Sequence, residues 1–86
     1  MVIKKSNDPI TIKGRVIAFE KDRHGKILEL AVETDDFQEY VVTHDIQWET
    51  LMRLFLKEVT ITGIVKSYNV HGHPIIDIHT IKTDET

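Results

Sequence analysis

Several stretches of this 86-residue chain place an apolar or small side chain at every second position. That period of two is the pattern of a β-strand with one face buried, because successive strand side chains point to opposite faces. The first runs from about Ile10 to Glu20, the second from Lys26 to Thr34, and a short third from Gln38 to Thr43. The same alternation resumes at Glu58, and a last stretch covers Pro74 to Lys82. The residues we expect to face inward are Ile12, Gly14, Val16, Ala18, Leu28, Leu30, Val32, Val59, Ile61, Gly63, Val65, Ile76 and Ile78.

Between the third and fourth stretches the period changes. Trp48, Leu51, Met52 and Phe55 recur at the spacing i, i+3, i+4, i+7, which predicts an amphipathic helix of about eleven residues. Asp45 precedes this stretch, where its carboxylate can accept hydrogen bonds from the first backbone N–H groups of the helix.

Two hairpins follow from the turn residues. Asp22-Arg23-His24-Gly25 predicts the first turn, in a register that pairs Ala18 with Leu30 and Val16 with Val32 inside. The same register pairs Arg15 with Glu33 and Lys13 with Asp35 outside. A second turn at His71-Gly72 pairs Val65 with Ile78 inside and Lys66 with Asp77 outside.

Three strands, one helix and two strands, in this order and at this length, resemble the OB-fold. The features that carry the resemblance are Gly14 and Gly63 inside strands, the helix, the run at 60–65 and the hairpin that follows it. The resemblance covers residues 10–82 and implies a mainly β, five-stranded Greek-key barrel that binds oligonucleotides or oligosaccharides. Sm-like and SH3-like barrels also have five short strands, but they lack a helix of this length at this place.

The length allows one domain. We expect a flexible N-terminal tail over residues 1–9, the barrel over 10–82 and a C-terminal tail over 83–86. The chain has no cysteine, which fits a reducing cytoplasm. No apolar run is long enough to cross a membrane, and the N-terminus lacks the pattern of a secretory signal.

Ligands of OB barrels lie between the loop that joins strands one and two and the loop that joins strands four and five. The first loop offers basic side chains and the second offers polar and aromatic ones, while Phe19 and Tyr68 face outward and can stack on bases. We therefore expect single-stranded DNA or RNA to contact Phe19, Lys21, Arg23, His24, Lys26, Tyr68, Asn69, His71 and His73. Alternatively, these are ordinary polar hairpin tips and the two rings only cover the barrel rim.

Charge argues against strong nucleic-acid binding. The net charge is -3, whereas phosphate-binding proteins usually carry an excess of Lys and Arg. The outward side chains of the second and third strands include Glu29, Glu33 and Glu39. A nucleic acid is therefore expected to bind weakly and through the loop tips.

A second hypothesis rests on outward apolar side chains of the first, fourth and fifth strands. If they form one patch, the chain is a protein-interaction module or a homodimer. The alternative is that they are scattered, as surface apolar residues commonly are. The proposed interface consists of Ile17, Phe19, Ile64, Tyr68, Ile75 and Ile81.

Metal binding and catalysis have less support. His71, His73 and His79 lie close in sequence and Asp77 could join them, but histidines in turns are usually solvated, and we predict no metal site. No nucleophile motif or Gly-rich phosphate loop is present, so we expect neither an enzyme nor a cofactor. The sequence thus predicts a non-catalytic binding module.

Overall fold

Five strands and one helix form the protein in the order that the hydrophobic periods predict. The computed structural model describes residues 8–83. Its elements are β1 (Ile10–Lys21), β2 (Ile27–Thr34), β3 (Glu39–Val42), α1 (Ile46–Met52), β4 (Glu58–Tyr68) and β5 (Pro74–Thr83). The strand prediction is confirmed within about one residue at each end that it specified. The predicted tails lie mostly outside the described residues, and Thr83 belongs to β5.

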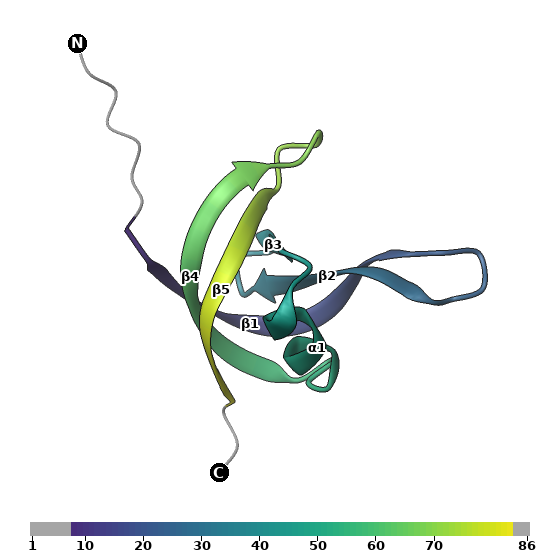
Figure 1. Ribbon diagram of the computed structural model, residues 1–86, viewed down its shortest axis with the longest axis horizontal. Helices are drawn as coiled ribbons and strands as arrows, with labels where there is room; N and C mark the ends of the chain where they lie inside the picture. Colours follow the sequence, from purple (N-terminus) through teal and green to yellow (C-terminus); the bar gives the residue numbers. More distant parts are fainter. Residues whose placement is uncertain (1–7, 84–86) are drawn as a thin grey trace.

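The five strands close into a barrel in the order β1-β2-β3-β5-β4 (Figure 1). Closure depends on the long first strand, which pairs with β4 over Ile10–Arg15 and with β2 over Gly14–Lys21. β3 and β5 run parallel and complete the ring. The predicted mainly β barrel, with its helix between the third and fourth strands, is therefore confirmed.

The barrel interior is filled by side chains from every strand and from the helix. Leu30, Leu51, Ile61 and Ile76 are the largest that are fully buried. Because apolar burial is the main favourable term in folding, this cluster stabilises the barrel. The cluster consists of Val16, Leu30, Val32, Val42, Trp48, Leu51, Val59, Ile61, Ile76 and Ile78.

The helix is shorter than its apolar stripe predicts. It has seven residues, and the chain continues in tight turns in which Leu54 N–H donates to the Leu51 carbonyl and Lys57 N–H to the Leu54 carbonyl. Leu56 has a φ of 67°, a left-handed conformation that cannot continue a helix. The predicted N-cap is confirmed, since the Asp45 carboxylate accepts from the Gln47 backbone N–H.

The first hairpin has the predicted register. Ala18 pairs with Leu30, Val16 with Val32 and Arg15 with Glu33. The predicted Lys13–Asp35 pair lies one residue beyond the last pair of this ladder, and both residues line one shallow depression.

Two compensating irregularities interrupt that hairpin near its turn. The register shifts once at Phe19 and shifts back at Leu28. Beyond the shift it is Ile27, and not Leu28, that packs against the core, while Leu28 is exposed. The predicted inward position of Leu28 is therefore wrong, because a bulge reverses the alternation of side chains on its strand.

The predicted register of the second hairpin is wrong, by one residue next to the turn, where Tyr68 pairs with Pro74, and by two residues over 63–65. Gly63 pairs with Ile78, and Val65 pairs with Ile76. One shift lies between Val65 and Ser67, and another between Thr62 and Gly63, where β5 has one extra residue at His79. The predicted Lys66–Asp77 pair is therefore wrong, and Asp77 pairs with Ile64.

The second shift also changes a predicted surface residue. Ile81 pairs with the buried Ile61 and packs against the core, although it was expected to face outward. The extra residue at His79 is the physical reason, since it reverses the side-chain alternation over the end of β5.

One row of apolar side chains crosses the outside of the sheet. The pairings place Ile17, Ala31, Val41 and Ile75 next to one another on β1, β2, β3 and β5. Ala31 and Val41 are buried, although neither belongs to the barrel core cluster. The outer face of this sheet is thus apolar along its middle, with charged residues on either side.

Candidate functional site

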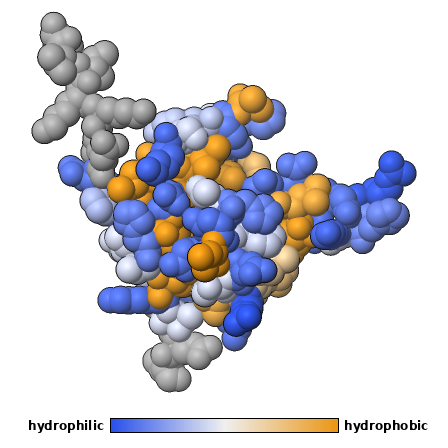
Figure 2. Space-filling model, viewed as in Figure 1, coloured by the Kyte–Doolittle hydropathy of each residue, from blue (hydrophilic) through white to orange (hydrophobic). Residues whose placement is uncertain are grey.

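The basic residues of the first loop lie at the end of a hairpin arm, which we define as residues 19–28. Figure 1 shows this arm extending away from the barrel. Its tip is fixed by Asp22, whose carboxylate accepts from the backbone N–H groups of His24 at 2.8 Å and Lys26 at 2.9 Å. Lys21, Arg23, His24 and Lys26 are at the surface there. In Figure 2 hydrophilic residues cover the outer end of the arm.

The loop that joins β4 and β5 is held by the same kind of contact. The side-chain oxygen of Asn69 accepts from the backbone N–H groups of His71 and His73, both at 2.9 Å. Gly72 completes the turn with a φ of 86°, which glycine adopts without steric cost. This geometry fixes the places of the two histidines that were predicted to contact a ligand.

Phe19 and His73 connect the two loop regions. Their rings lie edge to face, with centroids 5.1 Å apart and an interplanar angle of 76°. Phe19 belongs to β1 and His73 directly precedes β5, and these two strands are not neighbours in the sheet. Two predicted site residues that are far apart in sequence are therefore in contact, next to the apolar row on the outer face.

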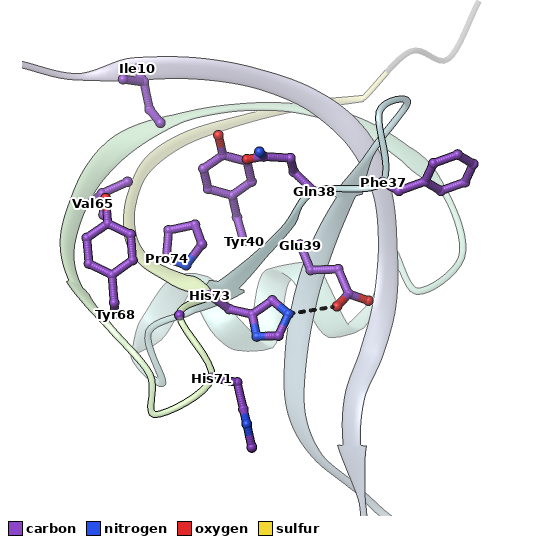
Figure 3. Close-up of a pocket in the computed structure, with 11 residues that line it drawn as sticks. Ile10, Phe37, Gln38, Glu39, Tyr40, Val65, Tyr68, His71, His73 and Pro74 are labelled. Carbon is purple, nitrogen blue, oxygen red and sulfur yellow. Dashed lines mark ion pairs between the residues drawn. The ribbon is translucent and has the colours of Figure 1, made fainter.

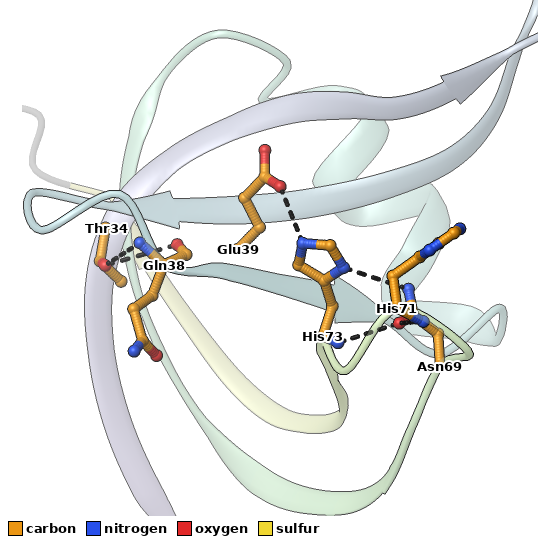
Figure 4. A network of polar contacts seen from close by, with 6 residues as sticks. All are labelled: Thr34, Gln38, Glu39, Asn69, His71 and His73. Atoms are coloured by element: carbon orange, nitrogen blue, oxygen red, sulfur yellow. Dashed lines mark hydrogen bonds and ion pairs between the residues drawn. The ribbon is translucent and has the colours of Figure 1, made fainter.

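His73 is also held by two polar side chains (Figure 4). Its Nδ1 lies 3.5 Å from the Asn69 side-chain nitrogen, and its Nε2 lies 3.4 Å from Glu39 Oε1. Because the Asn69 oxygen already accepts two backbone N–H groups, the amide nitrogen is the atom that faces the imidazole. A donor at Nδ1 and a carboxylate at Nε2 fit the neutral tautomer that carries its proton on Nε2.

These residues border an open pocket of about 650 Å³, which we call the aromatic pocket (Figure 3). It lies between the loop that joins β2 and β3 and the loop that joins β4 and β5. Five of its lining residues have aromatic rings, namely Phe37, Tyr40, Tyr68, His71 and His73. Ile10, Gln38, Glu39, Val65, Gly72 and Pro74 complete the lining. In Figure 3 the Phe37 ring points away from the rings of Tyr40, Tyr68 and His73, so the rings border the pocket separately and do not enclose it.

Phe37 is the lining residue of most interest that the sequence analysis missed. Its side chain is 81% exposed, and its backbone has a φ of 65°. A large aromatic residue seldom adopts that conformation, and backbone strain of this kind concentrates at functional sites. The signal in the sequence was a phenylalanine placed directly after the Asp35-Asp36 bend, where a polar residue or glycine is usual.

The charges of this region are unevenly distributed. The lining of the aromatic pocket contains one carboxylate, Glu39, and no Lys or Arg. The tip of the hairpin arm, residues 21–26, contains Lys21, Arg23 and Lys26 against the single carboxylate of Asp22. On the outer face Arg15 pairs with Glu58 at 3.9 Å. Cations and rings therefore occupy different parts of the candidate site.

The apolar interface predicted on the outer strands is not a single exposed patch. Ile17, Ile64 and Ile75 are only partly exposed, and Ile81 packs against the core. Ile17 and Ile64 lie apart on the surface. Ile64 follows Gly63, which pairs with the first residue of β1, whereas Ile17 lies in the second half of that strand. Tyr68 is 67% exposed but belongs to the aromatic pocket.

Within residues 8–83, no group of three or more His, Asp or Glu side chains is placed to hold a metal ion. His79 lies in the bulge of β5, where its carbonyl accepts from the Gln47 side chain at 3.3 Å. The one helix in the described part of the chain is too short and too polar to cross a membrane.

Comparison of the chain with protein-family models, with curated proteins and with solved structures gives no match.

Proposed function

We propose that this protein is a non-catalytic binding module of the OB type that holds single-stranded DNA or RNA. Support for the OB type comes from the strand order β1-β2-β3-β5-β4, the parallel pairing of β3 with β5, and the helix between β3 and β4. A partly open five-stranded barrel of this class carries its ligand between the first and last hairpin loops.

The observation that carries the proposal is the contact between Phe19 and His73. It joins the arm that carries the exposed cations to the pocket that carries the exposed rings. Single-stranded nucleic acids need both, because cations attract the phosphates and aromatic rings stack on the unpaired bases. We infer that phosphates lie along Lys21, Arg23 and Lys26 and that bases enter the aromatic pocket.

The acidic side chains limit the affinity. Glu33 and Glu39 face each other across β2 and β3 on the outer face, where they repel phosphates. Binding that relies on about three cations has a salt slope of about -2, so affinity falls roughly twentyfold between about 50 and 200 mM salt.

The test is a titration of a labelled mixed-sequence oligonucleotide of about 12 nucleotides, which matches the usual site size, at these two salt concentrations. Fluorescence anisotropy is expected to report salt-sensitive binding that is lost in the variant Lys21→Ala/Arg23→Ala/Lys26→Ala. The matched control is Arg53→Ala/Lys57→Ala/Lys82→Ala, which removes the same number of Arg and Lys side chains from exposed positions outside the arm and the pocket. Equal losses in the two variants, or no binding at the lower salt, would contradict the proposal.

A protein partner is the second candidate. The observation that favours it is a set of exposed apolar side chains near the loop that joins β2 and β3 and the loop that joins β4 and β5, namely Phe37, Tyr68 and Val70. Exposed apolar residues grouped in this way commonly mark protein contacts. A homodimer detected by sedimentation that dissociates in Tyr68→Lys, together with no oligonucleotide binding, would favour this candidate over the first.

A further inference from the structure

We infer that Glu39 makes the aromatic pocket selective for bases that carry an exocyclic amino group, namely adenine, cytosine and guanine, over thymine and uracil. This inference rests on the proposed function, since it assigns the part of a single strand that the pocket accepts.

The Glu39 carboxylate lies at the border of the aromatic pocket. Glu39 is the first residue of β3 and lines the aromatic pocket with Tyr40, Tyr68 and His73. Its side chain is 30% exposed and shares the outer face of the sheet with Glu33, whereas Tyr40, the next residue, packs against the core from the opposite face. Figure 3 shows one carboxylate oxygen directed to His73 and the other directed away from it.

The second carboxylate oxygen of Glu39 can accept a hydrogen bond from a ligand. The backbone N–H groups of His71 and His73 fix the Asn69 amide, the amide faces His73 Nδ1, and His73 Nε2–H is left to face Glu39 Oε1. This chain of contacts orients the carboxylate and occupies one of its oxygens. The other oxygen remains an acceptor, because an ionised carboxylate has no proton to donate.

The bases differ in the hydrogen-bonding groups that they carry on their Watson–Crick edges. Adenine, cytosine and guanine each present an amino group on the Watson–Crick edge, and a carboxylate accepts from such a group. Thymine and uracil have no amino group on this edge, and their single N3–H lies between two carbonyl oxygens, which repel a carboxylate that approaches it. Unpaired bases held between aromatic rings are commonly read on this edge. One well-placed contact of this kind discriminates by about tenfold.

The experiment compares labelled oligo(dC), oligo(dA) and oligo(dT), each of about 12 nucleotides, by fluorescence anisotropy in about 50 mM salt at neutral pH. Oligo(dC) and oligo(dA) are expected to bind about tenfold more tightly than oligo(dT). In Glu39→Gln the difference is expected to fall to about twofold or less, because a glutamine amide can also donate to the thymine carbonyl.

The matched control is Glu33→Gln. Glu33 lies directly opposite Glu39 on β2 but does not line the aromatic pocket. Removing its charge is expected to raise the affinity for all three oligonucleotides alike and to leave their ratio unchanged. The urea midpoint of each variant shows that it is folded.

The possible results of this experiment separate base selectivity from the proposed nucleic-acid binding. If all three oligonucleotides bind the wild-type protein equally, base selection is wrong and the proposed function stands. If the preference for oligo(dC) persists in Glu39→Gln, Glu39 is not its cause and the inference is wrong, while the proposed function stands. If none of the three binds, the proposed function is wrong and the selectivity inference is overturned with it. The wild-type comparison tests whether the protein selects among bases, and Glu39→Gln tests whether Glu39 is the cause.

Discussion

The backbone carbonyl of Glu33 on β2 occupies the space in which a β-carbon of Gly14 on β1 would lie. Gly14 pairs with Thr34 on one side and with Val59 on the other, so this is where β1 is shared between two neighbouring strands. Gly63 on β4 has the same relationship to the carbonyl of Asp77 on β5. Both glycines allow close backbone approach at positions where the barrel closes.

Replacing either of these glycines with alanine is expected to destabilise the barrel. The overlap with backbone atoms costs about 1–3 kcal/mol, because a carbonyl in a sheet cannot move aside as a side chain can. The reduced entropy of the unfolded chain offsets only about 0.4–1 kcal/mol of this. Urea denaturation of Gly14→Ala and Gly63→Ala should show lower midpoints with unchanged slopes.

The control for these two variants is Gly72→Asn. Gly72 has a positive φ, but a β-carbon added there would meet nothing within 4 Å, and asparagine tolerates this conformation better than most residues. We expect its stability to stay within about 0.5 kcal/mol of wild type. A loss as large as that of Gly14→Ala would contradict the steric explanation.

The N-cap of α1 gives a second prediction. A helix of seven residues is too short to be stable by itself, so it depends on its cap and on packing against the barrel. Asp45→Ala leaves the Gln47 backbone N–H without its side-chain acceptor and is expected to cost about 1 kcal/mol. Asp45→Asn keeps an acceptor oxygen, so it should lower the free energy of unfolding by at most a few tenths of about 1 kcal/mol. Equal urea midpoints for the alanine variant and the wild type would contradict the capping role.

A third prediction concerns Trp48, which is only 8% exposed and stacks on His44 with ring centroids 4.1 Å apart. Its indole N–H is buried with no hydrogen-bond partner among the described residues. Burying an N–H group without a partner costs about 1–3 kcal/mol. Replacing the indole with a phenyl ring removes this cost, and the gain offsets much of the packing energy that the smaller ring loses. We therefore expect Trp48→Phe to change stability by less than about 1 kcal/mol and Trp48→Ala to lose about 3–5 kcal/mol.

Unfolding of the Trp48 variants has to be followed by circular dichroism, since Trp48 is the only tryptophan in the chain. A loss of about 3 kcal/mol or more in Trp48→Phe would show that packing outweighs the unpaired donor.

The first hairpin was predictable because several independent signals agree on one register. The Asp22–Gly25 turn, the inward pair Val16–Val32 and the outward pair Arg15–Glu33 all require the same alignment. The helix position was predictable for the same reason, since Asp45 and the apolar stripe indicate the same start.

The second hairpin was not predictable, because its bulges leave no mark in the alternation. The pairing next to the turn differs from the prediction by one residue, and the shift near Lys66 adds a second. The shift at His79 moves the pairing back by one residue and reverses Ile81. The aromatic pocket was only partly predictable. His71, His73 and Tyr68 were expected from the loop positions, whereas Phe37, Tyr40 and Glu39 come together with them only when β3 pairs with β5.

The last prediction separates binding from stability at Phe37. Because its ring is 81% exposed, Phe37→Ala should change the free energy of unfolding by less than about 0.5 kcal/mol, as measured by urea denaturation. If the ring stacks on a base, the same change should weaken single-stranded oligonucleotide binding by about tenfold. Leu56→Ala is the matched control, since Leu56 is also exposed and also has a positive φ, but it does not line the aromatic pocket. Anisotropy titrations in which both variants bind as the wild type does would remove Phe37 from the ligand site, because an exposed ring that stacks on nothing leaves affinity unchanged.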